Sequence, residues 1–215
     1  MTSALDGVQI VTVLTAPSVS AALVAGHALE RAGITCVEVT LRTEAGREAI
    51  AALSRETGLI VGAGTVLTAE EVAAVSAAGA RFVVSPGLDE EVVEATRAAG
   101  LVSLPGVATA TELQRALRLG IDTVKFFPAD RLGGLDTIRA LAAPFPRVRF
   151  VPSGGISDGN AADYLRHPSI AAVSGSWVAP PSAVAAEDAG AIEQAASAAV
   201  SALVAAGIAA PRRAG

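Results

Sequence analysis

The sequence predicts an α/β protein with a (β/α)8 TIM barrel as its single domain, over residues 1–208. Three observations support this prediction. The chain has 215 residues, which is about the size of one small barrel. Hydrophobic residues make up 52% of it, which is ample for a core. Glycines that follow helix-like segments recur about every 20 to 25 residues, and a short apolar run follows each of them.

The repeat consists of alternating strands and helices. Glycine commonly follows the last turn of a helix, because it adopts the left-handed conformation without strain. Expected helix starts carry capping residues: Thr68 with Glu71 and Thr109 with Glu112 fit the capping-box spacing, and Asp89 begins an acidic first turn. The glycines expected to end helices are Gly33, Gly58, Gly79, Gly100 and Gly120.

Eight strands rich in branched residues are expected between these helices. In chain order they are Val8–Leu14, Cys36–Leu41, Leu59–Gly62, Arg81–Ser85, Val102–Pro105, Thr123–Phe127, Arg149–Pro152 and Ala171–Gly175. A last amphipathic helix is expected from Glu187 to Ala206, and residues 209–215 are expected to form a frayed tail. An open doubly wound sheet is the alternative, but no Gly-x-Gly-x-x-Gly motif opens the first helix.

Composition and charge exclude several classes of partner. A net charge of -5 and 3% aromatic residues argue against a protein that binds nucleic acid. A single cysteine excludes a disulfide framework. The charge-free stretch from Gly7 to Leu29 is interrupted by polar residues and Pro17, and no lysine or arginine precedes Arg31. Neither a membrane span nor a secretory signal is therefore expected, and we expect a cytoplasmic protein without a membrane partner.

The sixth expected strand carries the only lysine of the chain, Lys125. Side chains alternate along a strand, so Val124 and Phe126 are expected to face the helices and Lys125 the barrel interior. An amine in such a place is partly desolvated, which favours the neutral form that attacks a carbonyl. The alternative is a lysine at the rim with its charge in water, and an arginine-rich composition would also make lysine scarce.

The second expected strand places a carboxylate in the same interior. If its valines pack on helices, then Cys36, Glu38 and Thr40 point inward. A carboxylate inside a barrel is costly unless it is paired, and Lys125 is its natural partner. A purely structural ion pair is the alternative to a catalytic one. Cys36 is expected to be packed rather than reactive.

Further polar residues and glycines follow the ends of four strands. Arg42 is expected at the rim, where it can hold a carboxylate through two parallel hydrogen bonds, although a single arginine is most often a plain surface residue. The glycines from Gly62 to Gly64 are expected to follow the third strand, where backbone comes close to a ligand and Thr65 adds a hydroxyl. Two more segments, Ser153-Gly154-Gly155 and Gly175-Ser176, follow the seventh and eighth strands. Barrels of this kind usually bind phosphate there, through backbone N–H and hydroxyl groups. Plain glycine turns are the alternative for each segment.

Taken in order, these segments resemble the family of 2-keto-3-deoxy-6-phosphogluconate (KDPG) aldolases, also known as 4-hydroxy-2-oxoglutarate aldolases. The resemblance runs from about Val11 to Pro180. The matching segments are Val37–Thr43, Val61–Val66, Val84–Gly87, Leu104–Gly106, Lys125–Ala129, Pro144–Phe145, Val148–Phe150, Gly154–Ile156 and Gly175–Trp177.

The resemblance implies a class I aldolase that works without a metal or another cofactor and assembles as a homotrimer. No set of residues with metal-ligand spacing appears in the sequence, in line with that implication. Lys125 matches the Schiff-base lysine of the family, and Glu38 matches its general acid and base. The substrate positions are matched by Arg42 and Thr65 at the pyruvate carboxylate, Pro86 and Phe127 in the pyruvate pocket, and Gly154, Gly155 and Ser176 at the phosphate.

Two positions depart from the family pattern. Thr15 stands where some relatives have an arginine that reaches the phosphate, and Ser153 stands where many have threonine before the glycine pair. Losing a charge-assisted contact costs about 1.5–3 kcal/mol, which is a factor of about ten or more in affinity. A weakened preference for phosphorylated substrates is the expected consequence.

The expected reaction is the reversible cleavage of KDPG to pyruvate and glyceraldehyde 3-phosphate. The nearest alternative is cleavage of another 2-keto acid, such as 4-hydroxy-2-oxoglutarate, to pyruvate and glyoxylate, or 2-keto-3-deoxy-6-phosphogalactonate. A phosphate-binding barrel isomerase or epimerase is a second alternative and would form no covalent pyruvate adduct. A non-catalytic sensor of sugar acid phosphates is a third and would bind without turnover.

Overall fold

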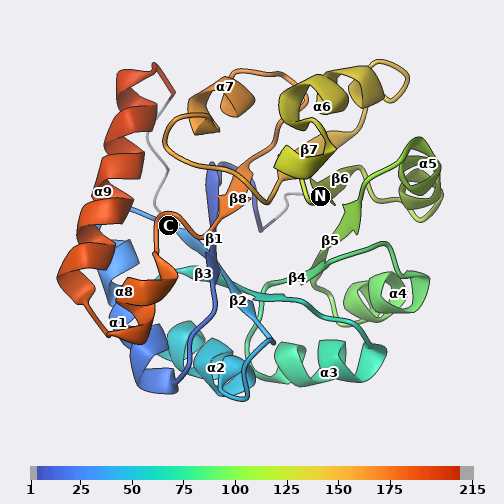
Figure 1. Cartoon of the computed structure of the whole chain (residues 1–215). Helices are drawn as coiled ribbons and strands as arrows, with labels where there is room; N and C mark the ends of the chain where they lie inside the picture. The colour runs from blue at the N-terminus through green and yellow to red at the C-terminus, as the bar shows by residue number, and fades with distance from the viewer. Residues whose placement is uncertain (1–3, 209–215) are drawn as a thin grey trace.

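The computed structural model describes residues 4–208, in which parallel strands alternate with helices (Figure 1). The expected tail at residues 209–215 lies outside the described residues. Within the described residues the strands are β1 Ile10–Leu14, β2 Cys36–Thr40, β3 Ile60–Gly64, β4 Phe82–Ser85, β5 Val102–Val107, β6 Thr123–Phe126, β7 Arg149–Pro152 and β8 Val173–Gly175.

The eight strands described between residues 4 and 208 form one parallel sheet in the order β7-β6-β5-β4-β3-β2-β1-β8. The two edge strands meet through isolated parallel bridges, Phe150 with Ile170 and Ser153 with Ser174. These bridges bring the sheet round on itself, so the predicted (β/α)8 TIM barrel is confirmed. All carboxyl ends of the strands therefore open on the same mouth of the barrel.

Helices surround the strands (Figure 1). In residues 4–208 they are α1 Val19–Arg31, α2 Gly46–Glu56, α3 Ala69–Ala77, α4 Glu90–Ala98, α5 Ala110–Arg118, α6 Gly134–Ala142, α7 Ala161–Leu165, α8 Pro181–Ala185 and α9 Ala189–Ala205, with a 3-10 turn at Asp130–Leu132. Helix α9 packs beside α1, and Arg31 bonds Glu193 across them at 2.8 Å. None of these described helices is long and apolar enough to cross a membrane.

The expected caps hold the helix starts. Thr68, Asp89 and Thr109 accept hydrogen bonds from backbone N–H groups in the first turns of α3, α4 and α5. Thr109 and Glu112 form a complete capping box. Four of the five expected glycines end helices in the left-handed conformation: Gly33, Gly79, Gly100 and Gly120, with φ between 73° and 96°.

The expectation that Gly58 ends a helix in the left-handed conformation is wrong. Helix α2 is instead capped by Thr57, whose backbone is extended (φ -129°) and whose hydroxyl donates to the carbonyl of Leu53 at 2.7 Å. The N–H of Gly58 donates to Glu30 Oε1 at 2.7 Å, and a Cβ at this position would lie 2.8 Å from that oxygen. Glycine is needed here because the Glu30 carboxylate comes close to the backbone, and not because the backbone makes a left-handed turn.

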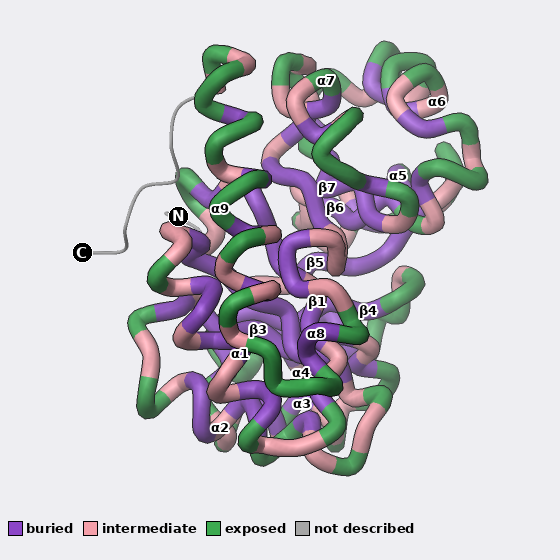
Figure 2. Tube along the Cα trace, turned by 60° about the vertical axis from the view of Figure 1, so that its left-hand side comes forward, coloured by how far each residue is buried: buried purple, intermediate pink, exposed green. Residues whose placement is uncertain are grey.

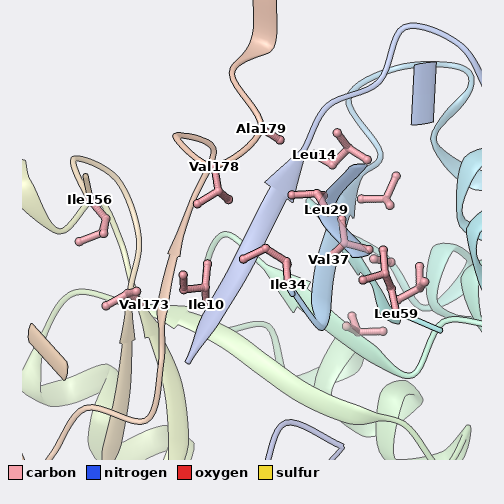
Figure 3. Packing of buried hydrophobic residues seen from close by; sticks show 14 of the residues in the cluster. Ile10, Leu14, Leu29, Ile34, Val37, Leu59, Ile156, Val173, Val178 and Ala179 are labelled. Atoms are coloured by element: carbon pink, nitrogen blue, oxygen red, sulfur yellow. The ribbon is translucent and has the colours of Figure 1, made fainter. Parts of the chain in front are cut away.

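Two apolar layers lie on the two sides of the strands. The outer layer packs strands against helices and contains Val37, Val39, Val124 and Phe126, as predicted. Figure 3 shows part of this layer, in which side chains of β1, β2 and β8 pack with Leu29 of α1. The inner layer fills the barrel and is made of Val8, Val11, Cys36, Phe82, Val84, Leu104, Val151 and Ala172. Burial follows the strands and the inward sides of the helices (Figure 2).

Strand β3 is longer than predicted and corrects the interpretation of its glycines. It continues through Gly64, which pairs with Thr40 of β2 and Val84 of β4. These glycines lie inside the sheet and do not form a loop near a ligand. A Cβ on Gly62 would lie 2.3 Å from the Phe82 ring, and one on Gly64 would lie 2.3 Å from Glu38 Oε1. Glycine is required at both positions by what fills the barrel.

Candidate active site

Lys125 and Glu38 meet inside the barrel, as the alternation of side chains predicted. Lys125 Nζ lies 3.3 Å from Glu38 Oε1 and donates a hydrogen bond to it. Both residues are buried, with 8% of Lys125 and 1% of Glu38 exposed. Glu38 Oε2 has no hydrogen-bond partner among the described residues. The pair therefore keeps one carboxylate oxygen free for a proton or a ligand beside the amine.

The surroundings of Glu38 are set by its neighbours on β2 and β3. Gly64 leaves the space that the carboxylate occupies, since any Cβ there would meet the Glu38 side chain. Cys36 lies two residues earlier on the same strand and is fully buried in the inner layer. Burial, with a smaller contribution from the Glu38 charge, raises the pKa of the Cys36 thiol well above its usual value. Cys36 is thus a neutral packing residue, as expected.

Arg42 lies at the rim, two residues after the end of β2, and is exposed. Its Nη2 donates to Thr15 Oγ1 at 2.8 Å, and Thr15 Oγ1 lies 2.9 Å from Thr40 Oγ1. Thr43 donates to the carbonyl of Ala16 at 2.8 Å, which ties the loops after β1 and β2 together. Arg42 makes no ion pair within residues 4–208, so its charge remains available to an anion in the mouth of the barrel.

A pocket of about 240 Å³ opens at this mouth above the lysine. Its lining combines the side chains at the ends of six strands: Val13, Glu38, Thr40, Arg42, Thr65, Pro86, Lys125, Phe127 and Ser153. The Phe127 ring centroid lies 5.3 Å from Lys125 Nζ. Thr65 has a left-handed backbone with φ 61°. For a β-branched residue that conformation costs about 1–3 kcal/mol, and such strain concentrates at functional sites.

Four predicted residues lie outside this lining: Gly154, Gly155 and Ser176 on the loops after β7 and β8, and Gly175 as the last residue of β8. Gly154 and Gly155 both have left-handed backbones, with φ 91° and 86°. Within residues 4–208 the backbone N–H groups of Gly154, Gly155 and Ile156 donate no hydrogen bond. A Cβ on Gly155 would lie 2.2 Å from the Cβ of Asp130. The loop therefore presents consecutive unpaired N–H groups, a backbone arrangement that suits an anion.

Two further hollows lie at the opposite end of the barrel. One has a volume of about 740 Å³ and is lined by residues of α4 and by residues at or just before the starts of β4, β5 and β6, among them Arg81, Arg97 and Asp122. The other, of about 350 Å³, lies between the end of α1 and the start of β3. Both are larger than the pocket above Lys125, but neither contains the buried amine or carboxylate. The chemistry of the barrel thus lies in its smaller hollow, at the carboxyl ends of the strands, where sites of this fold occur.

Sequence reasoning singled out seven of the residues that line this pocket and missed two others. Val13 carried no signal, because a valine in a strand is normally core. Thr40 was placed inward by the alternation along β2 but received no role. Thr15 was identified only as a departure from the family pattern, although its hydroxyl contacts Arg42. The register of β1 against β2, with Leu14 opposite Val39, could have placed Thr15 beside Thr40.

The fold and the site together define a class: a (β/α)8 barrel enzyme with a buried lysine and a carboxylate under a small pocket at the carboxyl ends of its strands. Comparison with known proteins specifies the family. Residues 1–195 match the aldolase family described as KDPG and KHG aldolase. The chain therefore belongs to the KDPG and KHG aldolases.

Individual relatives agree with this assignment. The chain is 48% identical over 186 residues to the 2-dehydro-3-deoxy-phosphogluconate aldolase of Treponema pallidum, covering 86% of this chain and 89% of the relative. The KDPG aldolase of Zymomonas mobilis, solved with 3-phosphoglycerate, has a TM-score of 0.86 and 39% identity over 91% of this chain and 92% of its own. The KDPG aldolase of Legionella pneumophila, solved with pyruvate as a covalent carbinolamine, has a TM-score of 0.86 and 35% identity, covering 91% and 96%.

Proposed function

We propose that this chain is a class I aldolase that reversibly cleaves KDPG to pyruvate and glyceraldehyde 3-phosphate through a Schiff base on Lys125. The observation that carries the proposal is the 3.3 Å contact between Lys125 Nζ and Glu38 Oε1, buried beneath a pocket with Arg42 at its rim. An amine that donates a hydrogen bond to a carboxylate has a direct path for proton transfer, so Glu38 can take the proton that keeps Lys125 from acting as a nucleophile.

The first half of the reaction forms the imine. Arg42 and Thr65 hold the substrate carboxylate, and Phe127 and Pro86 form the walls beside the ketone. Neutral Lys125 attacks the C2 carbonyl, and Glu38 gives the carbonyl oxygen the proton it needs to become the carbinolamine hydroxyl. Glu38, now a carboxylate, removes a proton from the carbinolamine nitrogen and passes it to that hydroxyl, which leaves as water. The protonated imine that remains is an electron sink beside the C3–C4 bond.

The second half breaks the carbon–carbon bond. Glu38, directly or through a water molecule, removes the proton of the C4 hydroxyl. The C3–C4 bond then breaks, its electrons move to the imine, and glyceraldehyde 3-phosphate leaves. Protonation of the enamine at C3 and hydrolysis of the imine release pyruvate and return the amine of Lys125. The free Oε2 of Glu38 is suited to this repeated proton transfer.

The loops after β7 and β8 are the proposed site of the substrate phosphate. The unpaired N–H groups of Gly154 and Gly155, with the hydroxyl of Ser176 on the neighbouring loop, can surround a phosphate without a cationic side chain. Ser153 begins the loop after β7 and Gly175 ends β8, and the Ser153–Ser174 bridge holds these two segments side by side.

Cleavage of 4-hydroxy-2-oxoglutarate is the second candidate, because Thr15 leaves the end of β1 without a positive charge for a phosphate. The ratio of kcat/KM for the two substrates separates them. We expect Thr15→Arg to raise the preference for the phosphorylated substrate by about tenfold, because a charged contact would be added. An unchanged preference would show that Thr15 has no part in the phosphate site.

The test of the proposal is borohydride trapping with pyruvate, followed by intact mass measurement and peptide mapping. Because Lys125 is the only lysine, the N-terminal amine is the one other primary amine in the sequence as given. One reduced pyruvate on Lys125 is the expected result. A folded protein without an adduct in excess pyruvate would overturn the aldolase proposal. We further propose a cytoplasmic homotrimer, and light scattering of the purified protein checks the oligomeric state.

A further inference from the structure

The strongest unassigned feature of the site is the contact between Arg42 and Thr15. Arg42 Nη2 donates to Thr15 Oγ1 at 2.8 Å. Thr15 Oγ1 in turn lies 2.9 Å from Thr40 Oγ1, and Thr40 is buried in the pocket lining. No other side chain within residues 4–208 forms a hydrogen bond or an ion pair with the Arg42 guanidinium. Thr15 is therefore the side-chain contact that fixes this exposed arginine.

The strand register explains why Thr15 and Thr40 meet. In the parallel pairing of β1 with β2, Leu14 lies opposite Val39, so the next residues, Thr15 and Thr40, lie beside each other at the mouth. A hydroxyl has one proton and two acceptor positions. Thr15 can thus accept from Arg42 and still share a hydrogen bond with Thr40, which holds its side chain in place from the barrel side.

The guanidinium needs such a restraint to recognise a carboxylate well. It is a planar group with five N–H donors, and it binds a carboxylate best through two parallel hydrogen bonds in one plane. An exposed arginine side chain otherwise samples many rotamers. Because the Thr15 bond occupies one donor of Nη2, it fixes the plane of the group while the other donors stay available to the pocket.

We propose that Thr15 is a positioning residue that orients Arg42 for the carboxylate of the 2-keto acid substrate. This inference rests on the proposed function, because it takes Arg42 as the carboxylate ligand. It assigns Thr15 a role at the carboxylate end of the substrate, whereas the sequence comparison had associated that position only with the phosphate end. Thr15 acts through Arg42 and touches no reacting atom.

The experiment compares wild type with variants at Thr15, Thr12 and Arg42 in borohydride trapping at increasing concentrations of pyruvate. Thr15→Val removes the hydroxyl and keeps the shape of the side chain, whereas Thr15→Ser keeps the hydroxyl. Thr12→Val is the matched control, because Thr12 is a buried threonine of β1, three residues before Thr15, whose hydroxyl has no partner among the described residues. The same series with pyruvamide, which has no carboxylate, gives the reference for binding that does not use Arg42.

We expect Thr15→Val to raise the half-saturating pyruvate concentration by about tenfold and to leave the maximal trapping rate within about twofold of wild type. Half-saturation by pyruvamide should not change. Thr15→Ser and Thr12→Val should behave as wild type. In a chain that already carries Arg42→Leu, the Thr15→Val change should have no further effect, because the two residues act as one unit.

Three results would overturn the inference: wild-type pyruvate binding in Thr15→Val, equal weakening for pyruvate and pyruvamide, or no rescue by serine. The maximal trapping rate shows in each case that the variant has folded around Lys125. A wild-type protein that forms no adduct at Lys125 would instead overturn the proposed function and the inference with it. The two failures are therefore distinguishable.

Discussion

The two halves of the barrel interior are built on the same strands but differ in what they hold. The half near the strand starts is filled with apolar side chains, among them Val11, Phe82 and Leu104. One inward position farther along β2, the packing residue Cys36 is followed by Glu38, which faces Lys125. The apolar half can thus supply rigidity, and the polar half can hold a buried charge pair and a strained Thr65 above it.

Two glycines of β3 show the same difference between the two halves within one strand. Gly62 and Gly64 both point into the barrel from β3, and both leave space for a side chain of a neighbouring strand. Gly62 makes room for the Phe82 ring, whereas Gly64 makes room for the Glu38 carboxylate. The same residue type therefore serves packing at one level and chemistry at the next, so substitutions at the two levels should have different consequences.

The largest expected effect is that of Lys125→Met in the polar half. No imine can form, so turnover and pyruvate trapping should both disappear. The change also leaves Glu38 buried without its cation, which typically costs about 3–5 kcal/mol of folding stability. A coupled assay for pyruvate and urea unfolding measure the two effects. The double variant Lys125→Met/Glu38→Gln should regain part of the stability and none of the activity. Activity near that of wild type in Lys125→Met would contradict the assignment.

Glu38→Gln should have the next largest effect. Loss of the general acid and base should lower kcat by about 10²–10⁴-fold, while Lys125 remains present. Cys36→Ala is the control one inward position below, where we expect reduced stability and an unchanged kcat per folded molecule. Steady-state kinetics with KDPG measures both. Equal losses of kcat in Glu38→Gln and Cys36→Ala would contradict the division of β2 into an apolar packing half and a catalytic half.

Gly64→Ala and Gly62→Ala test the distinction within β3. A methyl group at Gly64 would displace the Glu38 carboxylate, and kcat should fall by about ten- to a hundredfold, because small misplacements of catalytic groups are costly. A methyl group at Gly62 would overpack Phe82 and should cost about 1–3 kcal/mol of stability with little change in kcat. Urea unfolding and kinetics on both variants measure the pattern, and the reversed pattern would refute the interpretation.

The smallest expected effect lies outside both halves, at the capping box of α5. Burial alone would raise the pKa of the Glu112 carboxyl, but hydrogen bonds from the Ala108 N–H and from the N–H and hydroxyl of Thr109 outweigh it and lower that pKa below 4.5. The resulting stabilisation is present above pH 4.5 and is lost as the pH falls through the lowered value. Glu112→Gln should therefore cost about 0.5–1 kcal/mol at pH 7.

The pH dependence of that difference is the check. Urea unfolding of wild type and Glu112→Gln should differ at pH 7 and agree in acid, where the wild-type carboxyl is protonated as well. Activity per folded molecule should be the same for both proteins, because α5 contributes no residue to the pocket lining. A stability difference that persists unchanged in acid would show that the charge of Glu112 is not its cause.

The architecture was predictable because it depends on sequence signals that act locally. The repeating glycines, the threonine and aspartate caps and the apolar runs each act within a few residues, and together they predicted the strands that the structure contains. Alternation along β2 and β6 was enough to place Glu38 and Lys125 in the same interior, since only two directions are available to a strand side chain.

What could not be predicted depends on contacts between segments far apart in the sequence. The end of β3 was misplaced because glycine usually marks a turn, and only Phe82 and Glu38 explain why it lies within the strand. Gly58 was misinterpreted for the same reason, because its requirement comes from Glu30 of another helix. The contact of Thr15 with Arg42 depends on strand register, which the sequence does not state.

The presence of a single lysine at the bottom of the pocket has a practical consequence for handling this protein. Coupling chemistry that targets primary amines normally labels many surface lysines and leaves an enzyme working. In this chain the same reagents can reach only the amino terminus and the residue on which turnover is proposed to depend. Attachment to a resin or a dye through amines would thus titrate the active site itself. Filling the pocket with pyruvate during coupling should direct the label to the chain end.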